Sequence, residues 1–585
     1  MPYRLIQFIC LAILVQVSAP SQETESAQRA RPQNAERVDA SPQLRFRGGA
    51  QRGIYKSQTA ADVATFPASS SAHPDSKVDR PPAVGAPPES FFELVLERDR
   101  DAAREFYRKY IDVAGMPVVA AEEVADEALQ RTYSIVTHML AGRPDITKEM
   151  IDSGMYLIII GKDQVYTDMP ENRNARNPDY LNERVRGTGG RPTSFGEENL
   201  LGWPIDRYDD ESIAVHEFCH TIDRALRSID PAWAERRNTV YENAMAKGLW
   251  KNAYAASNPG EYWAEIAQTY FDSQRVNNWN HGPIGTREQL KEYDPEGYEL
   301  VRNTFRLGPN QDWRYPWPKQ LPNVVLPPEG LKIDPYYTKF TWAREFTVVG
   351  RAASDEALLK ANDVIRKMFA YRHDILKALI ADGVRLVVLG RNESLADLPE
   401  FASLESNEGI DVLTRTLNYS PDKKLLVLSE ENVLGDPADP MIGSNQVIRV
   451  FANAAYQVCA TRPVDPNWEN RGRDVQQYEL HVERLDVRFA EALKKLYNQA
   501  MSQGKWQGTT AVHDPVAYWT AGVLAYFDAV GQDAAPNDAA HPIDSREALE
   551  QYDPDLFAFV RKAMAYEGHV DWRLEPENSH LQDAP

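Results

Sequence analysis

The residues with the clearest chemical potential are His216, Glu217 and His220, which form the run HEFCH. On a helix, residues i and i+4 project from one face, so the two imidazoles can hold one Zn²⁺. Glu217 lies beside them, where it can accept a proton from a water that the metal activates. The alternative is a helix whose histidines make ordinary polar contacts. The pattern predicts a metal-dependent hydrolytic site.

A catalytic zinc takes a third protein ligand and leaves its fourth position to water or substrate. The segment NPGEYWAE, residues 258–265, supplies two candidates, Glu261 and Glu265. Pro259 suits the first turn of a helix, and on that helix the two carboxylates share one face. One can bind the metal while the other orients a ligand histidine. Spacing alone does not choose between them, and a solvated acidic face is the alternative.

Ordered matches along the chain indicate two homologous domains, at residues 90–316 and 335–576. The sequence of each domain predicts an α+β fold with few strands. It does not show the regular alternation of strands and helices that is typical of a doubly wound sheet. In the first domain we expect helices over 121–141, 144–153, 212–227, 233–248 and 260–272, and a buried strand over 156–160. The matched segments include 126–129 with 355–358, 157–161 with 386–390, 262–263 with 518–519, and 293–295 with 552–554.

The second domain lacks the residues proposed for chemistry. Alignment on the Asp-Pro-Trp markers at 230–233 and 465–468 places Phe451, Ala452 and Ala455 under His216, Glu217 and His220. Alignment on the Tyr-Trp markers places Thr510, Ala517 and Ala521 under Tyr254, Glu261 and Glu265. Packing residues persist while the polar ones are lost together, which a purely structural role does not predict. We therefore expect the second domain to be a degenerate copy that binds no metal.

The run HEFCHTID, followed about forty residues later by GEYWAEIAQTYF, resembles the catalytic domain of the anthrax toxin lethal factor family of zinc peptidases. The resemblance is most specific at these two helices and implies a zincin-like fold, present here in tandem. It assigns Glu261 as the third zinc ligand and Glu265 as a carboxylate that orients a ligand; Asp223 is a further candidate for that role. Tyr254 would stabilise the oxyanion.

Four other residues near these helices are further candidates for the surroundings of the site. Cys219 stands where the family usually has glycine, and we expect it to pack, although it could be oxidised or contact the metal. Phe195 and Gly196 could form an edge strand that pairs with extended substrate, with a plain loop as the alternative. His281 lies in a predicted loop that could line the cleft.

The N-terminus predicts export. Arg4 precedes an apolar run over 5–17 and small residues that end at Ala19, which indicates a signal peptide over 1–19, with an uncleaved anchor as the alternative. Residues 20–89 are rich in Ser, Ala, Pro and Gln, so we expect a disordered tether. Residues 317–334 form a Pro-rich linker, and 577–585 a tail. A secreted or periplasmic location follows, without a membrane span after cleavage.

Composition excludes some partners. The formal net charge of −21 disfavours nucleic acid and anionic membrane surfaces. Only three cysteines occur, and Cys10 would leave with the signal peptide, so Cys219 and Cys459 cannot build a disulfide framework.

Together these patterns predict a secreted zinc-dependent metalloendopeptidase that acts on a protein or peptide substrate. One alternative is a non-catalytic binding protein built from two zincin-like domains. Another is a self-processing protease whose own tether is the substrate.

Overall fold

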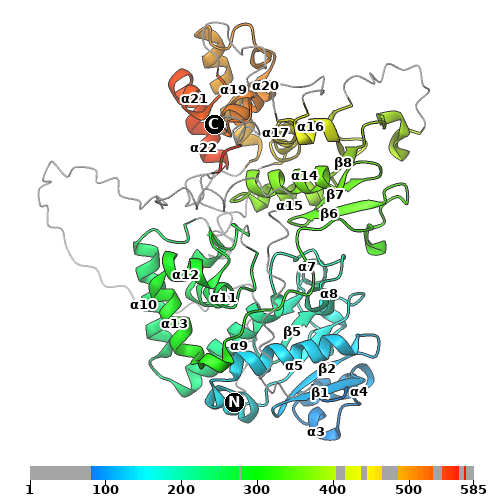
Figure 1. Cartoon of the computed structure of the whole chain (residues 1–585), viewed down its shortest axis with the longest axis vertical. Coiled ribbons are helices and arrows are strands. Elements are labelled where there is room, and N and C mark those ends of the chain that lie inside the picture. The colour runs from blue at the N-terminus through cyan, green and yellow to red at the C-terminus, as the bar shows by residue number, and fades with distance from the viewer. Residues whose placement is uncertain are drawn as a thin grey trace, which may run out of the picture.

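The computed structural model describes residues 81–251, 253–275, 278–402, 415–436, 445–463, 485–530, 543–564 and 572–574. The predicted signal peptide, most of the tether and the tail lie outside these ranges. The described chain forms two mixed α/β halves, each with a five-stranded mixed sheet. Figure 1 shows the first half below, from blue to green, and the second half above, from light green to red. This architecture is compatible with the expected α+β class.

The sheet of the first half has the order β1-β2-β3-β5-β4. Strands β2, β3 and β5 run parallel, while β1 and β4 pair antiparallel at the two edges. All four residues of β3 are buried, as expected for an apolar strand covered on both faces. The strand predicted at 156–160 is therefore confirmed. The strands are β1 Lys109–Val113, β2 Met116–Ala120, β3 Leu157–Ile160, β4 Gly187–Thr188 and β5 Thr193–Gly196.

Two helices with capped N-termini contain the candidate site residues. In α9, Ile213–Ile229, the Ser212 hydroxyl accepts a hydrogen bond from the Val215 amide. In α11, Pro259–Tyr270, the Asn258 side chain accepts from two amides of the first turn. The other helices of this half are α3 Glu89–Phe92, α4 Arg100–Phe106, α5 Asp126–Leu140, α6 Pro144–Asp152, α7 Pro178–Arg184, α8 Glu197–Leu201, α10 Trp233–Ala246, α12 Arg287–Tyr293 and α13 Pro295–Phe305. All five predicted helices are present.

The second half has the strand order β6-β7-β8-β10-β9, with the same pattern of parallel and antiparallel pairs. Its strands are β6 Lys339–Ala343, β7 Phe346–Gly350, β8 Arg385–Leu389, β9 Leu417–Ser420 and β10 Leu425–Ser429. Its helices are α14 Asp355–Met368, α15 His373–Ala381, α16 Glu430–Leu434, α17 Gln446–Cys459, α19 Val487–Ser502, α20 Pro515–Tyr526, α21 Arg546–Tyr552 and α22 Pro554–Met564.

Buried hydrogen bonds recur between the halves. In the first, the Trp250 indole and the Tyr262 hydroxyl both donate to Asp294, at 2.9 and 2.6 Å. In the second, Trp506 and Tyr518 donate to Asp553 at 2.8 and 2.7 Å.

A second pair of recurring hydrogen bonds corrects the predicted alignment of α9 with α17. Trp263 donates through its indole to the Cys219 carbonyl, and Trp519 donates to the Ala452 carbonyl. The capping residues agree with this register, because Ser212 and Asn445 both donate backbone hydrogen bonds to the loop after the partner helix. The positions of His216, Glu217 and His220 are therefore held in α17 by Arg449, Val450 and Asn453.

The predicted alignment with Phe451, Ala452 and Ala455 is thus wrong by two residues. It was anchored on the Asp-Pro-Trp marker, which follows the helix, and the chain between the helix and the marker is two residues longer in the second half. The second marker itself lies outside the described residues. The absence of the chemical residues from α17 holds in either register.

Both predicted connecting segments pack partly onto the folded halves. Gly85 exchanges two backbone hydrogen bonds with Tyr110, so the first half begins before the predicted boundary at residue 89. In the linker, Val325 pairs with Phe340, and the Trp317 indole donates to the Asp272 carbonyl. Among the described helices, none combines the length and the apolar character that crossing a membrane requires.

Candidate metal centre

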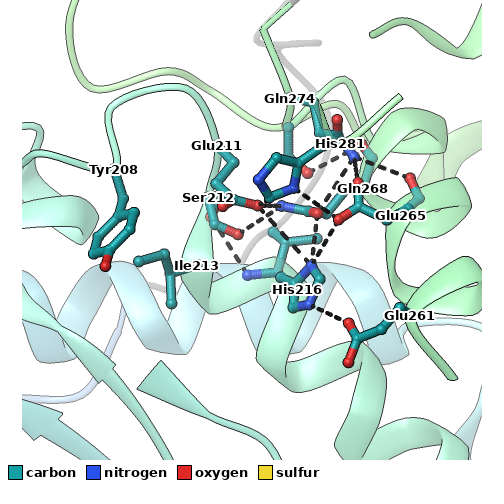
Figure 2. A network of polar contacts seen from close by, with 12 residues as sticks. Tyr208, Glu211, Ser212, Ile213, His216, Glu261, Glu265, Gln268, Gln274 and His281 are labelled. Atoms are coloured by element: carbon teal, nitrogen blue, oxygen red, sulfur yellow. Dashed lines mark hydrogen bonds and ion pairs between the residues drawn. The ribbon is translucent and has the colours of Figure 1, made fainter. Parts of the chain in front are cut away.

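Helices α9 and α11 bring three potential metal ligands together. His216 Nε2 lies 3.1 Å from His220 Nε2, and each of these nitrogens lies 3.2 Å from Glu261 Oε2. A tetrahedral zinc with bonds of about 2.0–2.1 Å separates its ligand atoms by about 3.3 Å, so this triangle has the size of one face of such a site. The predicted ligand set therefore fits a zinc ion. Figure 2 shows Glu261 reaching toward His216 from the neighbouring helix.

The charges around this triangle favour a cation. Burial lowers the pKa of the His216 imidazole, but the hydrogen bond to Glu261 and the charges of Glu265 and Glu217 raise it well above its usual value. Burial also lowers the pKa of His220, and Glu261 more than compensates, so the net shift is upward. Burial raises the pKa of Glu261, but the two histidines bring it well below its usual value. A divalent ion would replace the protons that this cluster attracts.

Gln268 is the residue that orients His216. Its Oε1 atom lies 2.8 Å from His216 Nδ1, while its Nε2 donates to Glu211 at 3.0 Å and to the Ser212 carbonyl at 3.2 Å. These two donated bonds fix the orientation of the amide, so its oxygen faces the imidazole. Gln268 is not among the residues that the sequence predicts for the site, although it continues the helical face of Glu261 and Glu265 at the next turn.

Glu265 lies on the opposite side of His216 from the ligand triangle. Its Oε1 is 3.6 Å from His216 Nδ1 and 2.8 Å from His281 Nδ1, and Gln274 donates to its other oxygen. The side chain is fully buried. Glu265 therefore contacts His216 less closely than Gln268 does, and it also holds His281. The predicted loop residue His281 thus belongs to the polar network around the site (Figure 2).

A second group of converging donors lies on the Nδ1 side of His216. Ligand atoms of Glu211, His216 and Glu265 all lie within 4.8 Å of one another. Because Gln268 already occupies the hydrogen-bonding position on Nδ1, the two carboxylates of this group add negative charge beside His216.

Asp223 was expected to orient a ligand, but the structure gives it other partners. Its carboxylate accepts from the Trp233 indole at 2.8 Å and from Arg237 at 2.6 Å, and its second oxygen pairs with Arg227. These contacts attach α10 to α9, one turn beyond the ligands. Asp223 therefore stabilises the packing of the metal helix, and the expectation that it orients a ligand is corrected.

The expected edge strand is also corrected. Strand β5, which contains Phe195 and Gly196, lies between β3 and β4, so its backbone is already paired on both sides. The edge of the sheet is β4, Gly187–Thr188. Strand β4 could not be predicted from the sequence, because it is short and lies in a glycine-rich segment without an apolar run.

Strand β4 and the residues after it lie directly against α9. A Cβ atom at Gly187 would come within 2.4 Å of Ile213 and 3.0 Å of the Glu217 side chain. One at Gly189 would come within 2.5 Å of the His220 Cβ and 3.4 Å of a Glu217 carboxylate oxygen. Glycine at both positions therefore lets the backbone approach Glu217 and His220.

Tyr254 packs against His216. Its ring centroid lies 6.4 Å from that of His216, with the two planes inclined by 26°, and 5.5 Å from that of His281. The backbone amides of Tyr254 and Ala255 donate to the carbonyls of Asn280 and His281, at 2.6 and 3.1 Å. The loop at 278–281 thus holds the backbone of the candidate oxyanion donor.

Cys219 is fully buried in the core of the first half. Burial, with smaller contributions from Glu217 and Glu265, raises the pKa of its thiol well above the usual value, so the thiol stays protonated. Cys219 and Cys459 are both buried, and neither takes part in a disulfide. This placement agrees with a packing role.

Comparison of the chain with protein-family models, with curated proteins and with solved structures found no match in any of the three. The chemistry of the site therefore rests on its own residues.

Proposed function

We propose that this protein is a zinc-dependent metalloendopeptidase whose active centre consists of His216, Glu217, His220 and Glu261. The observation that carries the proposal is the triangle of ligand atoms 3.1 to 3.2 Å apart, with Glu217 next to it on the same helix. Three protein ligands leave one position of a tetrahedral ion for water or substrate, which is typical of catalytic zinc.

Each residue of the proposed active centre has its own role in peptide hydrolysis. A zinc ion held by the three ligands would polarise the scissile carbonyl and the attacking water. Glu217 accepts the proton of that water and delivers it to the leaving amine. Tyr254 donates a hydrogen bond to the oxyanion, because its ring lies beside His216. The free edge of β4, which lies against Glu217, is suited to pair with an extended peptide.

We also infer that the second half is a degenerate copy of a zincin-like domain. The common strand order and the recurring Trp–Asp–Tyr hydrogen bonds support a duplication. At the places of the ligands and the base it has Arg449, Asn453, Ala517 and Val450, which include no carboxylate or imidazole. The proposal therefore includes one zinc ion per chain. Export to the periplasm or the exterior rests on the N-terminal sequence pattern.

The test is a metal analysis of the purified protein combined with digestion of a peptide library, with and without a chelator. We expect one zinc per chain and cleavage that chelation abolishes and added zinc restores. The His216→Ala variant should lose both. Cleavage that continues in the chelated protein would contradict the proposal, and N-terminal sequencing of the protein after incubation reveals any self-processing.

The competing interpretation is an interaction protein with a closed, structural ion. Such a site needs a fourth protein ligand. Among the described residues, the donor group that contains both histidines has Glu261 as its only further member. A protein that retains one zinc but cleaves no member of the library would favour this alternative.

A further inference from the structure

Two segments of the first half contact the candidate site on one side and the second half on the other. One is segment 208–212, which contains Glu211. The other is loop 278–281, which contains His281. Both lie next to the network shown in Figure 2. The residues that link them to the second half are Asp210 and Trp279.

Trp279 belongs to the apolar core of the second half. It is 3% exposed, and all other buried members of its cluster, such as Ala343 and Phe346, come from residues 343–572. The next two residues along the chain are Asn280 and His281, whose carbonyls accept the amides of Tyr254 and Ala255. An apolar anchor in one half thus lies directly beside the backbone support of the candidate oxyanion donor in the other.

Asp210 forms a buried ion pair across the two halves. Its Oδ1 lies 2.7 Å from Nη2 of Arg366 on α14, whose side chain is completely buried, and 3.5 Å from Arg275. Burial raises the pKa of Asp210, but the charges of Arg366 and Arg275 bring it to about 2, so the carboxylate is ionised. Removing one member of such a pair leaves an uncompensated buried charge.

The residue after Asp210 is part of the site's network. Glu211 pairs through a backbone bridge with Gln274, and its carboxylate accepts from Gln268, which orients His216. The same carboxylate lies 3.6 Å from His281 Nδ1. Arg366 therefore reaches His216 through a continuous chain of contacts: Asp210, Glu211 and Gln268.

A third contact joins the second half to the first. In the β6–β7 turn of the second half, Arg344 and Glu345 have φ angles of 54° and 66°. Residues with a side chain seldom adopt this left-handed conformation. Glu345 is buried and pairs with Arg184 of the first half at 3.0 Å. The corresponding turn of the first half, Ala114-Gly115, also has positive φ angles, but it is exposed.

We propose that the second half, whose helices α17 and α20 have no carboxylate or imidazole at the places of the four active-centre residues, is a built-in positioning domain for the active site of the first half. Arg366 and Trp279 are positioning residues. Arg366 holds the segment that supports Gln268 and His216, and Trp279 holds the loop that supports Tyr254. The inference rests on the proposed peptidase function for its effect on activity, but the positioning itself is a property of the fold.

The experiment compares full-length Trp279→Ala, Arg366→Gln and Arg366→Lys with the wild type. The control is Arg385→Gln, which removes an arginine that pairs with Glu400 inside the second half. Three quantities are measured: hydrogen exchange of the Tyr254 and Ala255 amides, zinc affinity by chelator competition, and kcat and KM for a cleaved peptide. The visible spectrum of the cobalt-substituted protein reports the ligand geometry.

Trp279→Ala should speed exchange of the two amides and lower kcat, with little change in zinc affinity. Arg366→Gln should lower zinc affinity by about 10-fold, the lower end of the range for residues behind metal ligands, and change the cobalt spectrum. Arg366→Lys should recover part of both losses, because it restores a cation beside Asp210. The Arg385→Gln control should match the wild type in all measurements.

Folded Trp279 and Arg366 variants that match the wild type in exchange, affinity and kcat would overturn the inference and leave the proposed function intact. If the wild type neither binds zinc nor cleaves peptide, the proposed function fails. Amide exchange then still decides whether the second half positions these segments. If Trp279→Ala does not fold, Trp279→Leu replaces it, because leucine retains an apolar contact.

Discussion

The Nδ1 atom of His216 lies 2.8 Å from the side-chain oxygen of Gln268. Because the amide nitrogen of Gln268 is committed to Glu211 and Ser212, its oxygen is the acceptor and the imidazole proton resides on Nδ1. When a metal ion replaces the proton on Nε2, the lone pair of that nitrogen then faces His220 and Glu261. A neutral amide thus selects the tautomer that a metal ligand needs.

Replacing Gln268 with leucine should therefore weaken the metal site without unfolding the helix. The corresponding residue of α20 is Leu524, so a leucine fits this position in a related setting. We expect zinc affinity to fall by about 10–100-fold, the usual effect of losing a residue that orients a ligand. Chelator competition measures it, and Gln499→Leu, on the surface of the second half, is the control. Unchanged affinity would show that Glu265 alone can orient His216.

Glu217→Gln should retain zinc and lose catalysis. The carboxylate lies outside the ligand triangle, and glutamine preserves its shape but cannot accept the proton. We expect kcat to fall by at least about 100-fold, at the low end of the range for general acid–base catalysis. Metal analysis and peptide cleavage are measured on the same sample, with the exposed Glu235→Gln as the control. Full activity in Glu217→Gln would contradict the assigned mechanism.

The two carboxylates of α11 should respond differently to removal. Glu261→Ala deletes a direct ligand and should leave the site empty at ordinary zinc concentrations. Glu265→Ala should weaken zinc by about 10–100-fold and leave activity that added metal restores, because Glu265 contacts His216 and His281 without entering the triangle. Titration with a chelator, with folding followed by circular dichroism, gives the comparison. The reverse order of affinities would assign the ligand to Glu265 and remove the basis of the family resemblance.

Tyr254→Phe should retain zinc and lower kcat by about 100-fold or more, the effect of deleting one donor to an oxyanion. The ring packing against His216 and His281 survives in phenylalanine, so the folded structure should be unchanged. Steady-state kinetics with a cleaved peptide measure the loss. Tyr241→Phe removes a different, partly buried hydroxyl, one that donates to the Ala256 carbonyl, and serves as the control. A loss confined to KM would point to substrate binding and not to the oxyanion.

Zinc affinity should rise with pH. The pKa values of His216 and His220 are raised by the surrounding carboxylates, so protons compete with the metal above the ordinary histidine value of 6.5. Each proton displaced adds about tenfold to the apparent affinity per pH unit in this window. Chelator competition between about pH 6 and pH 9 tests the slope. An affinity independent of pH would contradict the raised pKa values.

The stability of the metal-free protein should change with pH in the opposite direction and fall as the pH rises. A group whose pKa is raised by folding contributes stability below its unfolded pKa, and that contribution is lost as pH rises through the folded pKa. Thermal unfolding of the chelated protein should therefore show a falling midpoint as the pH rises above about 6.5, the unfolded histidine value. The zinc-loaded protein should show a weaker dependence, because the metal replaces the protons. The His216→Gln, His220→Gln double variant is the control and should lose most of this dependence.

The local pattern of the sequence was sufficient to predict those parts of the site that lie on a single helix. His216, Glu217 and His220 share one face because helical periodicity is local, and Ser212 and Asn258 cap the two helices that the sequence predicts. The loss of the histidines and the glutamate from α17 could also be read directly, although the register of that helix could not. A marker beyond the end of a helix does not report the two additional residues in between.

The tertiary structure alone decided which groups meet across helices and between the halves. Gln268 orients His216, Asp223 attaches α10, and β4 replaces β5 as the edge strand, because these relations depend on how α9, α11 and the sheet pack. The contact of Arg366 with Asp210 joins residues more than a hundred positions apart. No periodicity or spacing records such a contact, because it is set by the packing of the two hydrophobic cores against each other.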